Sequence, residues 1–189
     1  MTTPGPALQV DLIVLIGYRG SGKTAVGGVL AERLGWEFVD TDDLVEQRAK
    51  RTIREIFEKD GELAFRRIEA DVLGKVLNGR KCVISAGGGA VLSRRNRKAM
   101  RGAGACVWLT APPEELHRRT SQDESTQARR PDLTEQGGLD EIETVLQARL
   151  PVYEATADLV VSTVGLTVRQ VANTILDRLA GVGRGTEAF

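Results

Sequence analysis

Five short apolar runs divide this chain, and apolar residues recur every three or four positions in the longer segments between them. The runs lie at about 11–16, 36–40, 83–85, 106–109 and 159–161. Short apolar runs are typical of strands buried on both faces, and the intervening spacing is typical of helices. Because strands and helices alternate, the pattern predicts a three-layer α/β/α fold, in which helices cover both faces of a five-stranded parallel sheet.

Several of the predicted helices have recognisable ends. Gly35 ends the first helix, which spans 23–34. The stretch Thr52-Ile53-Arg54-Glu55 is a capping box that opens a short helix reaching Phe57, and Thr167 caps the last helix. We expect further helices at about 62–77, 93–101 and 139–149, and others that begin near 44 and 110.

The length of 189 residues is most simply that of one domain, 1–189, with a core at about 11–178. Residues 121–137 are polar and contain few apolar anchors. A loop of this length in a compact domain is usually a functional lid or disordered, so we expect a mobile lid here. Residues 1–9 and the tail from Gly181 contain Gly and Pro, and we expect both to be disordered.

Composition and charge limit the classes of partner. The 26 basic and 26 acidic residues give no net charge, so the overall field attracts neither nucleic acid nor a membrane surface. No segment has the ~18 consecutive apolar residues of a membrane span, and the N-terminus lacks the basic region of a signal peptide. Cys82 and Cys106 lie inside strand-like runs, which favours buried free thiols and a reducing, cytoplasmic location.

The first apolar run leads directly into Gly17-Tyr18-Arg19-Gly20-Ser21-Gly22-Lys23-Thr24, and a predicted helix follows. In this context the pattern G-x-x-x-x-G-K-[ST] indicates a phosphate-binding loop. Its glycines allow successive backbone N–H groups to face an anion at a helix N-terminus. Lys23 is expected to reach the β- and γ-phosphates of a nucleoside triphosphate, and the Thr24 hydroxyl to bind Mg²⁺. A glycine-rich turn with a solvated lysine is the alternative.

Two further motifs follow predicted strands and therefore lie at the same edge of the sheet as the loop. Asp40 and Asp42 are two residues apart, so in extended backbone both carboxylates face the same way. One could hold the water shell of a metal and the other accept a hydroxyl proton, although both could simply be acids that stabilise a helix N-terminus. Gly87-Gly88-Gly89 indicates either a ligand close to the backbone or a tight turn.

Three arginines are candidates for binding an anionic substrate. Arg66 lies three residues before Glu69 on a predicted helix, so the carboxylate could fix the guanidinium for bidentate recognition. Spacing alone favours an ordinary surface pair over this arrangement. Arg130, in the predicted lid, could close over transferring phosphates or be a solvated charge. Arg149, taken alone, is typical of a cation at a helix C-terminus.

Taken together, these motifs resemble the shikimate kinase family over residues 11 to 178. The phosphate loop alone is shared by many families, whereas the ordered combination is specific. It consists of Gly17–Thr24, Asp40-x-Asp42, Phe57, Phe65-Arg66-x-x-Glu69, Gly87–Gly89, Arg130-Pro131 and Arg149-x-Pro151-x-Tyr153. The resemblance implies strand order 2-3-1-4-5 and transfer of the ATP γ-phosphate to the 3-hydroxyl of shikimate, with Mg²⁺ as cofactor.

The resemblance also implies roles for individual residues. The nucleotide would be bound by Gly20, Ser21, Gly22, Lys23, Thr24, Ala25, Arg119 and Arg130, with Arg119 against the adenine. Shikimate would be bound by Asp42, Phe57, Phe65, Arg66, Gly87, Gly88, Gly89 and Arg149, with Glu69 supporting Arg66. Thr24 and Asp40 would serve the metal, and Lys23, Asp42 and Arg130 would be catalytic.

The family usually offers an arginine to the adenine after the fifth strand, where this chain reads Ser162-Thr163-Val164-Gly165-Leu166. We therefore expect the base to depend mainly on Arg119. Two rival functions are a gluconate kinase of the same architecture and a catalytically silent nucleotide-binding module. The expected partners are ATP and shikimate alone, with no nucleic acid or membrane, and the expected state is a monomer.

Overall fold

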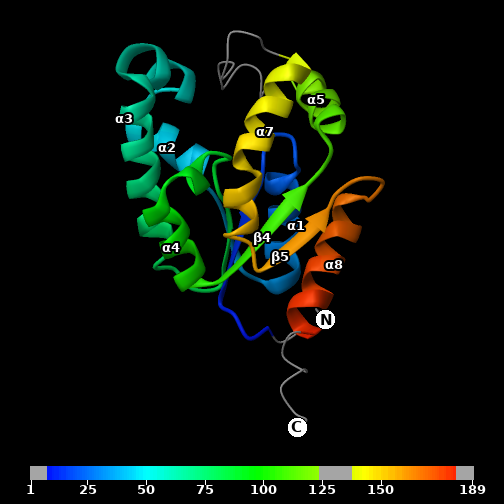
Figure 1. The fold of residues 1–189 in the computed structure, drawn as a ribbon. Coiled ribbons are helices and arrows are strands. Elements are labelled where there is room, and N and C mark those ends of the chain that lie inside the picture. Colours follow the sequence, from blue (N-terminus) through cyan, green and yellow to red (C-terminus); the bar gives the residue numbers. More distant parts are fainter. Residues whose placement is uncertain (1–7, 124–137, 182–189) are drawn as a thin grey trace.

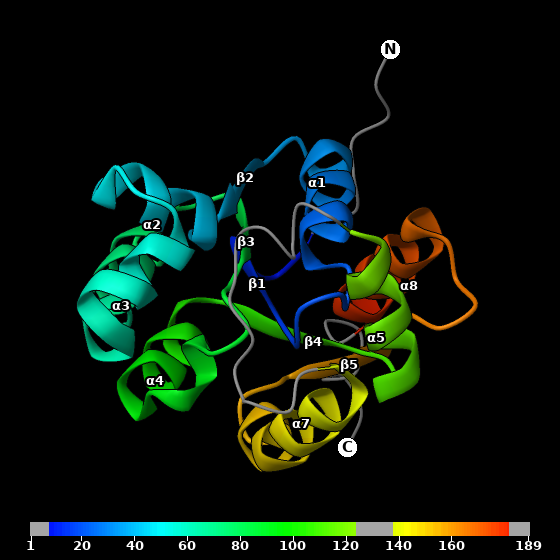
Figure 2. The ribbon, with the colours of Figure 1, turned by 90° about the horizontal axis from the view of Figure 1, so that it is seen from above.

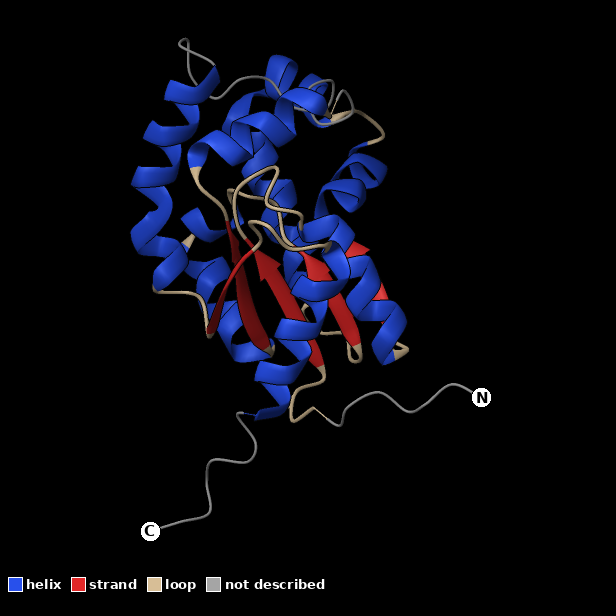
Figure 3. Ribbon diagram, turned by 90° about the vertical axis from the view of Figure 1, so that its right-hand side faces the viewer, coloured by secondary structure: helices blue, strands red, loops and turns tan. Residues whose placement is uncertain are grey.

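The computed structural model describes residues 8–123 and 138–181. Its centre is a parallel sheet of five strands in the order β2-β3-β1-β4-β5, as predicted (Figure 1). The strands are β1 (Leu12–Ile16), β2 (Glu37–Asp40), β3 (Cys82–Ser85), β4 (Ala105–Thr110) and β5 (Leu159–Ser162). The carboxyl ends of all five meet at one edge of the sheet, where the connecting loops gather (Figure 3).

Helices cover both faces of this sheet (Figure 2). In the described residues they are α1 (Lys23–Leu34), α2 (Thr41–Ala49), α3 (Ile53–Val76), α4 (Arg94–Ala103), α5 (Pro113–Gln122), α7 (Gly138–Glu154) and α8 (Val168–Gly181), with a short 3₁₀ turn η1 (Ala90–Leu92). None of these helices has the length and apolar composition needed to cross a membrane.

Strand β1 shows why the sheet is buried on both faces. Its side chains alternate between two apolar clusters, so Leu12 and Val14 pack with α3, α4 and α7, whereas Ile13 and Leu15 pack with α1 and α8. Each of these four side chains is at most 1% exposed. This burial explains the continuous apolar run in the sequence and confirms the predicted three-layer fold.

A smaller apolar cluster joins α2 to α3 beside β2, at the edge of the sheet. The capping box predicted at Thr52 and Glu55 is present and opens α3. The predicted division into a short and a longer helix is confirmed within α3, because Gly61 has the non-helical angles φ 80° and ψ 171° and separates two helical parts. Glycine adopts this backbone conformation without steric cost.

The predicted end of α7 is wrong. This helix continues past Arg149 and includes Pro151, and it ends at Glu154. Packing of its last turn outweighs the loss of one backbone donor at the proline. Tyr153 is fully buried there and stacks on Trp108, with ring centroids 5.5 Å apart.

Both cysteines are buried free thiols, as predicted. Burial raises the pKa of Cys82 to about 11 and that of Cys106 to about 12. Both side chains are therefore neutral at physiological pH and pack as apolar residues.

Candidate active site

The phosphate loop connects β1 to the first turn of α1. Gly17, Gly20 and Gly22 have φ values of 142°, 78° and 91°, which L-residues with side chains rarely adopt. The Lys23 ammonium donates to the backbone oxygens of Gly17 and Tyr18, both at 2.9 Å. The lysine is thus held across its own loop, at the N-terminus of a helix, where an anion is favoured.

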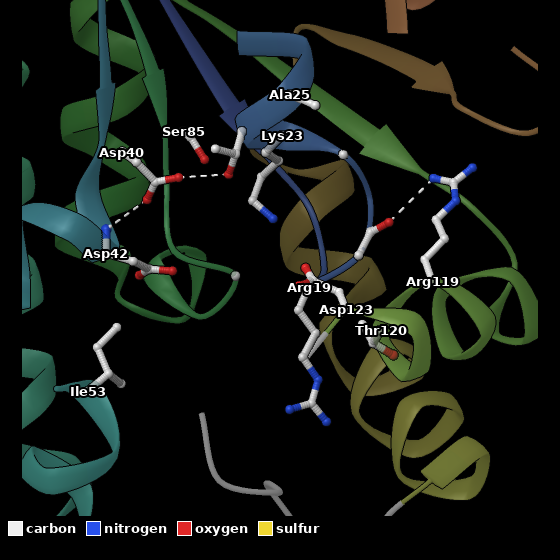
Figure 4. A pocket seen from close by; sticks show the side chains of 14 residues that line it. Arg19, Lys23, Ala25, Asp40, Asp42, Ile53, Ser85, Arg119, Thr120 and Asp123 are labelled. Atoms are coloured by element: carbon white, nitrogen blue, oxygen red, sulfur yellow. Dashed lines mark hydrogen bonds between the residues drawn. The ribbon is translucent and has the colours of Figure 1, made fainter. Parts of the chain in front are cut away.

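The loop meets the end of β2 through Thr24, whose hydroxyl donates to Oδ2 of Asp40 at 2.8 Å (Figure 4). The other oxygen of Asp40 accepts from the backbone N–H of Asp42 at 3.0 Å, so Asp40 is the N-cap of α2. The prediction that Asp40 and Asp42 share extended backbone is therefore wrong: Asp42 lies in the first turn of α2. Their carboxylates nevertheless border one cavity.

This cavity, of about 310 Å³, lies at the carboxyl edge of the sheet. It is lined by the phosphate-loop residues Arg19, Gly20, Gly22, Lys23, Thr24 and Ala25, and by Asp40, Asp42, Ile53, Ser85, Gly88, Arg119, Thr120 and Asp123. Ser21, which belongs to the same loop, is buried. Residues from five separate segments thus converge on one site, where ligands of open α/β sheets bind.

Arg66 is fixed by two carboxylates on its own helix. Its guanidinium donates to Glu69 at 2.8 Å and to Glu62 at 3.0 and 3.2 Å. Glu69 is only 1% exposed, so the alternative of an ordinary surface pair is wrong. Burial disfavours the charged guanidinium, but the carboxylates outweigh this effect, and the pKa of Arg66 lies above its usual value.

The guanidinium of Arg66 lies directly against Gly89, where a Cβ would overlap it. Phe65 packs beneath Arg66, with 5.1 Å between the guanidinium carbon and the ring centroid. The Phe57 ring is 4.8 Å from that of Phe65. Arg66 and the two aromatic rings therefore form one wall beside the triple glycine.

Arg149 reaches the triple glycine from the other direction. It lies within α7, not at a helix end as its sequence position indicates when taken alone, and it is only 8% exposed. Its Nη1 donates to the Gly88 oxygen at 3.2 Å, and the Tyr153 hydroxyl donates to the same oxygen at 2.7 Å. The Gly87 N–H donates to the buried hydroxyl of Thr41 at 3.0 Å. These bonds fix the glycine backbone next to two arginines.

Arg119 borders the opposite end of the cavity. Its guanidinium donates to the hydroxyl and the backbone oxygen of Thr163, at 2.9 and 3.1 Å, and to the Gly20 oxygen at 3.4 Å. Glu115 accepts from its Nε at 2.7 Å. Hydrogen bonds from Arg118 and Arg119 lower the pKa of Glu115 to about 2.

Some predicted features lie elsewhere or outside the described residues. The described residues do not include 124–137 of the predicted lid, and therefore not Arg130. They also do not include residues 1–7 and the tail 182–189. The first two residues of the predicted lid, 121 and 122, belong to α5.

Sequence reasoning assigned no role to several residues that the structure places at the site: Arg19, Thr41, Glu141, Tyr153 and Thr163. The sequence position of Glu141 could have indicated a role at the site, because this carboxylate lies on the same buried side of the helix as Leu146, Arg149 and Tyr153. Thr41 and Thr163 follow the ends of β2 and β5, and both are buried. A buried polar residue after a strand of a parallel sheet borders the ligand edge.

Comparison with known proteins agrees with this geometry. The family model for shikimate kinase matches residues 19–180. A shikimate kinase of Symbiobacterium thermophilum is 44% identical over 167 residues, covering 88% of this chain and 95% of the relative. One of Cereibacter sphaeroides is 42% identical over 168 residues, covering 89% and 82% of the two chains.

A solved structure gives the same result. Shikimate kinase from Acinetobacter baumannii in complex with shikimate superposes with a TM-score of 0.86 at 33% identity, covering 95% of this chain and 97% of that one. The family model covers most of the chain, and the two relatives align over 95% and 82% of their length. This chain belongs to the shikimate kinase family.

Proposed function

We propose that this protein transfers the γ-phosphoryl group of ATP to the 3-hydroxyl of shikimate, which gives shikimate 3-phosphate and ADP. One observation carries the proposal: Arg66 and Arg149 converge on the triple glycine, which packs against the phosphate loop. A Cβ on Gly88 would lie 3.3 Å from the Gly17 oxygen. An acceptor whose carboxylate is bound by two arginines would thus lie directly beside the phosphates.

The acceptor side suits a small hydroxylated carboxylic acid. Two fixed guanidinium groups can bind one carboxylate with charge-assisted hydrogen bonds. Phe57 and Phe65 would contact the apolar face of the ring, and Gly87, Gly88 and Gly89 allow its close approach. At the other end of the ring, Asp42 would bind the hydroxyl groups and accept the proton of the one that attacks phosphorus.

The nucleotide side is the phosphate loop. Backbone N–H groups of Gly20, Ser21, Gly22 and Ala25 would bind the phosphates, and Arg119 would contact the adenine. Lys23, released from its own loop, would stabilise the charge on the transferring group, for which fixed positive charge is a dominant catalytic factor. Arg130 has the same proposed role by resemblance alone.

Mg²⁺ fits the oxygen pair at Thr24 and Asp40. Magnesium prefers oxygen ligands and binds through one or two carboxylates, water and substrate phosphates. Among the described residues there is no cluster of three or more His, Cys, Asp or Glu side chains of the kind that holds a metal by protein ligands alone. Thr24 would bind the ion directly and Asp40 through water, and the ion would neutralise charge on the β- and γ-phosphates.

Three further proposals describe the protein as a whole. We infer a single kinase domain over residues 1–189, a cytoplasmic location and a monomer that needs no nucleic acid or membrane partner. Size-exclusion chromatography with light scattering tests the monomer directly, since a dimer would have twice the mass of 20.5 kDa.

The experiment that tests the function is an ADP-release assay with shikimate, gluconate or no acceptor, each with ATP and Mg²⁺. We expect release that depends on shikimate. Release that depends on gluconate would indicate the rival sugar-acid kinase, and equal release in all three reactions would contradict phosphoryl transfer to either acceptor.

A further inference from the structure

The phosphate loop is tied to α7 by an ion pair that the proposed mechanism does not use. Nη2 of Arg19 donates to Oε1 of Glu141 at 2.5 Å, although the two residues are 122 positions apart. The Glu141 side chain is fully buried, whereas 15% of the Arg19 side chain remains exposed. The carboxylate is thus enclosed by protein, whereas part of the Arg19 side chain remains accessible, and Arg19 is one of the residues that line the cavity.

The position of Arg19 within the loop determines what it can reach. It lies between Gly17 and Gly20, in the part of the loop before the Lys23–Thr24 pair. Figure 4 shows its side chain directed away from Asp40 and Ser85. Arg19 is therefore on the side of the loop opposite the proposed metal position.

Arg19 and Arg149, one of the two proposed acceptor arginines, both lie near the Tyr18 ring. The guanidinium carbon of Arg19 is 5.7 Å from the centroid of the Tyr18 ring, and that of Arg149 is 5.9 Å from the same centroid. A Cβ on Gly88 would lie 3.7 Å from the Arg19 backbone nitrogen. Arg19 thus lies at the boundary between the phosphate loop and the proposed acceptor position, where the phosphoryl group must pass.

Stability alone gives a weak reason for such a pair. The cost of removing two charges from water often cancels their attraction, and apolar residues of similar volume serve as well. A guanidinium, by contrast, carries five N–H donors in a rigid fork, so one edge can bind a carboxylate while another binds a phosphate. Glu141 can therefore orient Arg19 without preventing it from binding a ligand.

We propose that Arg19 contacts the phosphoryl group during its transfer, and that Glu141 is the positioning residue that holds the guanidinium in place. This proposal rests on the proposed function for the identity of the acceptor, but the phosphate contact itself requires only a nucleoside triphosphate. Charge on the equatorial oxygens of the transferring group is stabilised best by a cation that needs no rearrangement during the reaction. The buried Glu141 provides this fixed orientation.

The test compares Arg19→Met, Arg19→Lys, Glu141→Gln and the double variant Arg19→Met/Glu141→Gln. Arg33→Met on α1 and Glu143→Gln on α7 are matched controls, because both side chains are exposed and the charge changes are the same. Thermal unfolding of each variant establishes that it is folded. The double variant also removes the buried carboxylate that Arg19→Met alone would leave without this cation.

For Arg19→Met we expect kcat to fall roughly tenfold to hundredfold, with a change of less than about threefold in the shikimate KM. Arg19→Lys should retain more activity, and Glu141→Gln should lower kcat by a smaller factor. The double variant should be no slower than Arg19→Met, since Glu141 acts through Arg19. If the pair had a purely structural role, the substitutions would lower the unfolding temperature and leave kcat within about twofold of wild type. That result would overturn the proposal.

A binding measurement separates this proposal from the acceptor assignment. Wild-type and variant proteins are titrated with an imido analogue of ATP and, separately, with ADP, both in the presence of Mg²⁺. The difference between the two affinities reports the γ-phosphate contact without any acceptor. Arg19→Met should lower the affinity for the analogue by about tenfold and the affinity for ADP by less than about twofold, as expected for loss of one charge-assisted contact. Equal losses for the two nucleotides would contradict the proposal even if shikimate turnover were normal, and the unequal loss would support it even if shikimate were not the acceptor.

Discussion

The Thr24 hydroxyl donates a hydrogen bond of 2.8 Å to the carboxylate of Asp40, a residue 16 positions further along the chain. This bond joins the phosphate loop to the end of β2. Because Asp40 also caps α2 through the Asp42 N–H, it links the proposed metal position with the proposed base. Asp40 therefore has a structural role as a helix cap besides its proposed role at the metal.

Asp40→Asn should keep the helix cap, since Asn caps as well as Asp, but weaken metal binding. We expect the Mg²⁺ concentration for half-maximal rate to rise about tenfold or more, as for other residues that hold a metal through its outer shell. Asp43→Asn, an exposed change in the same helix turn, is the control. An unchanged Mg²⁺ dependence in Asp40→Asn would exclude the metal role.

Lys23→Met should lower kcat by at least ~10²-fold, because fixed positive charge at the transferring group is usually a dominant factor. Lys75→Met, which alters an exposed lysine in the last turn of α3, should leave kcat unchanged. Both are measured by ADP release at saturating substrates. A Lys23→Met protein with near wild-type turnover would mean that the phosphate loop has been misinterpreted.

Arg66→Ala should weaken shikimate binding far more than ATP binding, by roughly 2–5 kcal/mol, since the substrate carboxylate loses a charged partner. Arg149→Ala should have a similar effect, and Glu69→Ala a milder one, because Glu69 only orients Arg66. The neighbouring Arg67 is exposed, so Arg67→Ala serves as the control. Titration calorimetry that finds equal losses for both substrates would indicate misfolding instead.

Arg119→Ala should raise the KM for ATP from several-fold to roughly thirtyfold, with little change in kcat, because a guanidinium over an aromatic face contributes roughly 0.5–2 kcal/mol. Thr163→Val, which removes one hydrogen bond to that guanidinium, should raise the same KM by about threefold. Arg169 lies exposed in the first turn of α8, and Arg169→Ala should have little effect. Kinetics with the reverse ranking of Arg119 and Arg169 would contradict the assignment.

The sequence was sufficient for features set by local chemistry. The apolar runs predicted all five strands, and the phosphate loop follows from its own spacing and flanking elements. Features set by packing between distant segments were not predictable. The burial of Glu69 and the position of Arg149 within α7 depend on such packing. Taken alone, Glu69 indicated an ordinary surface pair with Arg66, and Arg149 indicated a cation at a helix C-terminus.

One error has a local cause that periodicity does not detect. Asp40 is the N-cap of α2, so the chain is already helical at Asp42. The pair of Arg19 and Glu141 could not be predicted at all, since it joins a variable position of the loop to a helix 122 residues away.

The central claim is tested most directly by identifying the product. The protein is incubated with ATP, Mg²⁺ and shikimate, and ¹H–³¹P correlation spectroscopy locates the new phosphoryl group. We expect one phosphate ester per ADP, attached to the 3-hydroxyl of shikimate. Inorganic phosphate as the only phosphorus product besides ADP, or an ester at another hydroxyl, would contradict the proposed function.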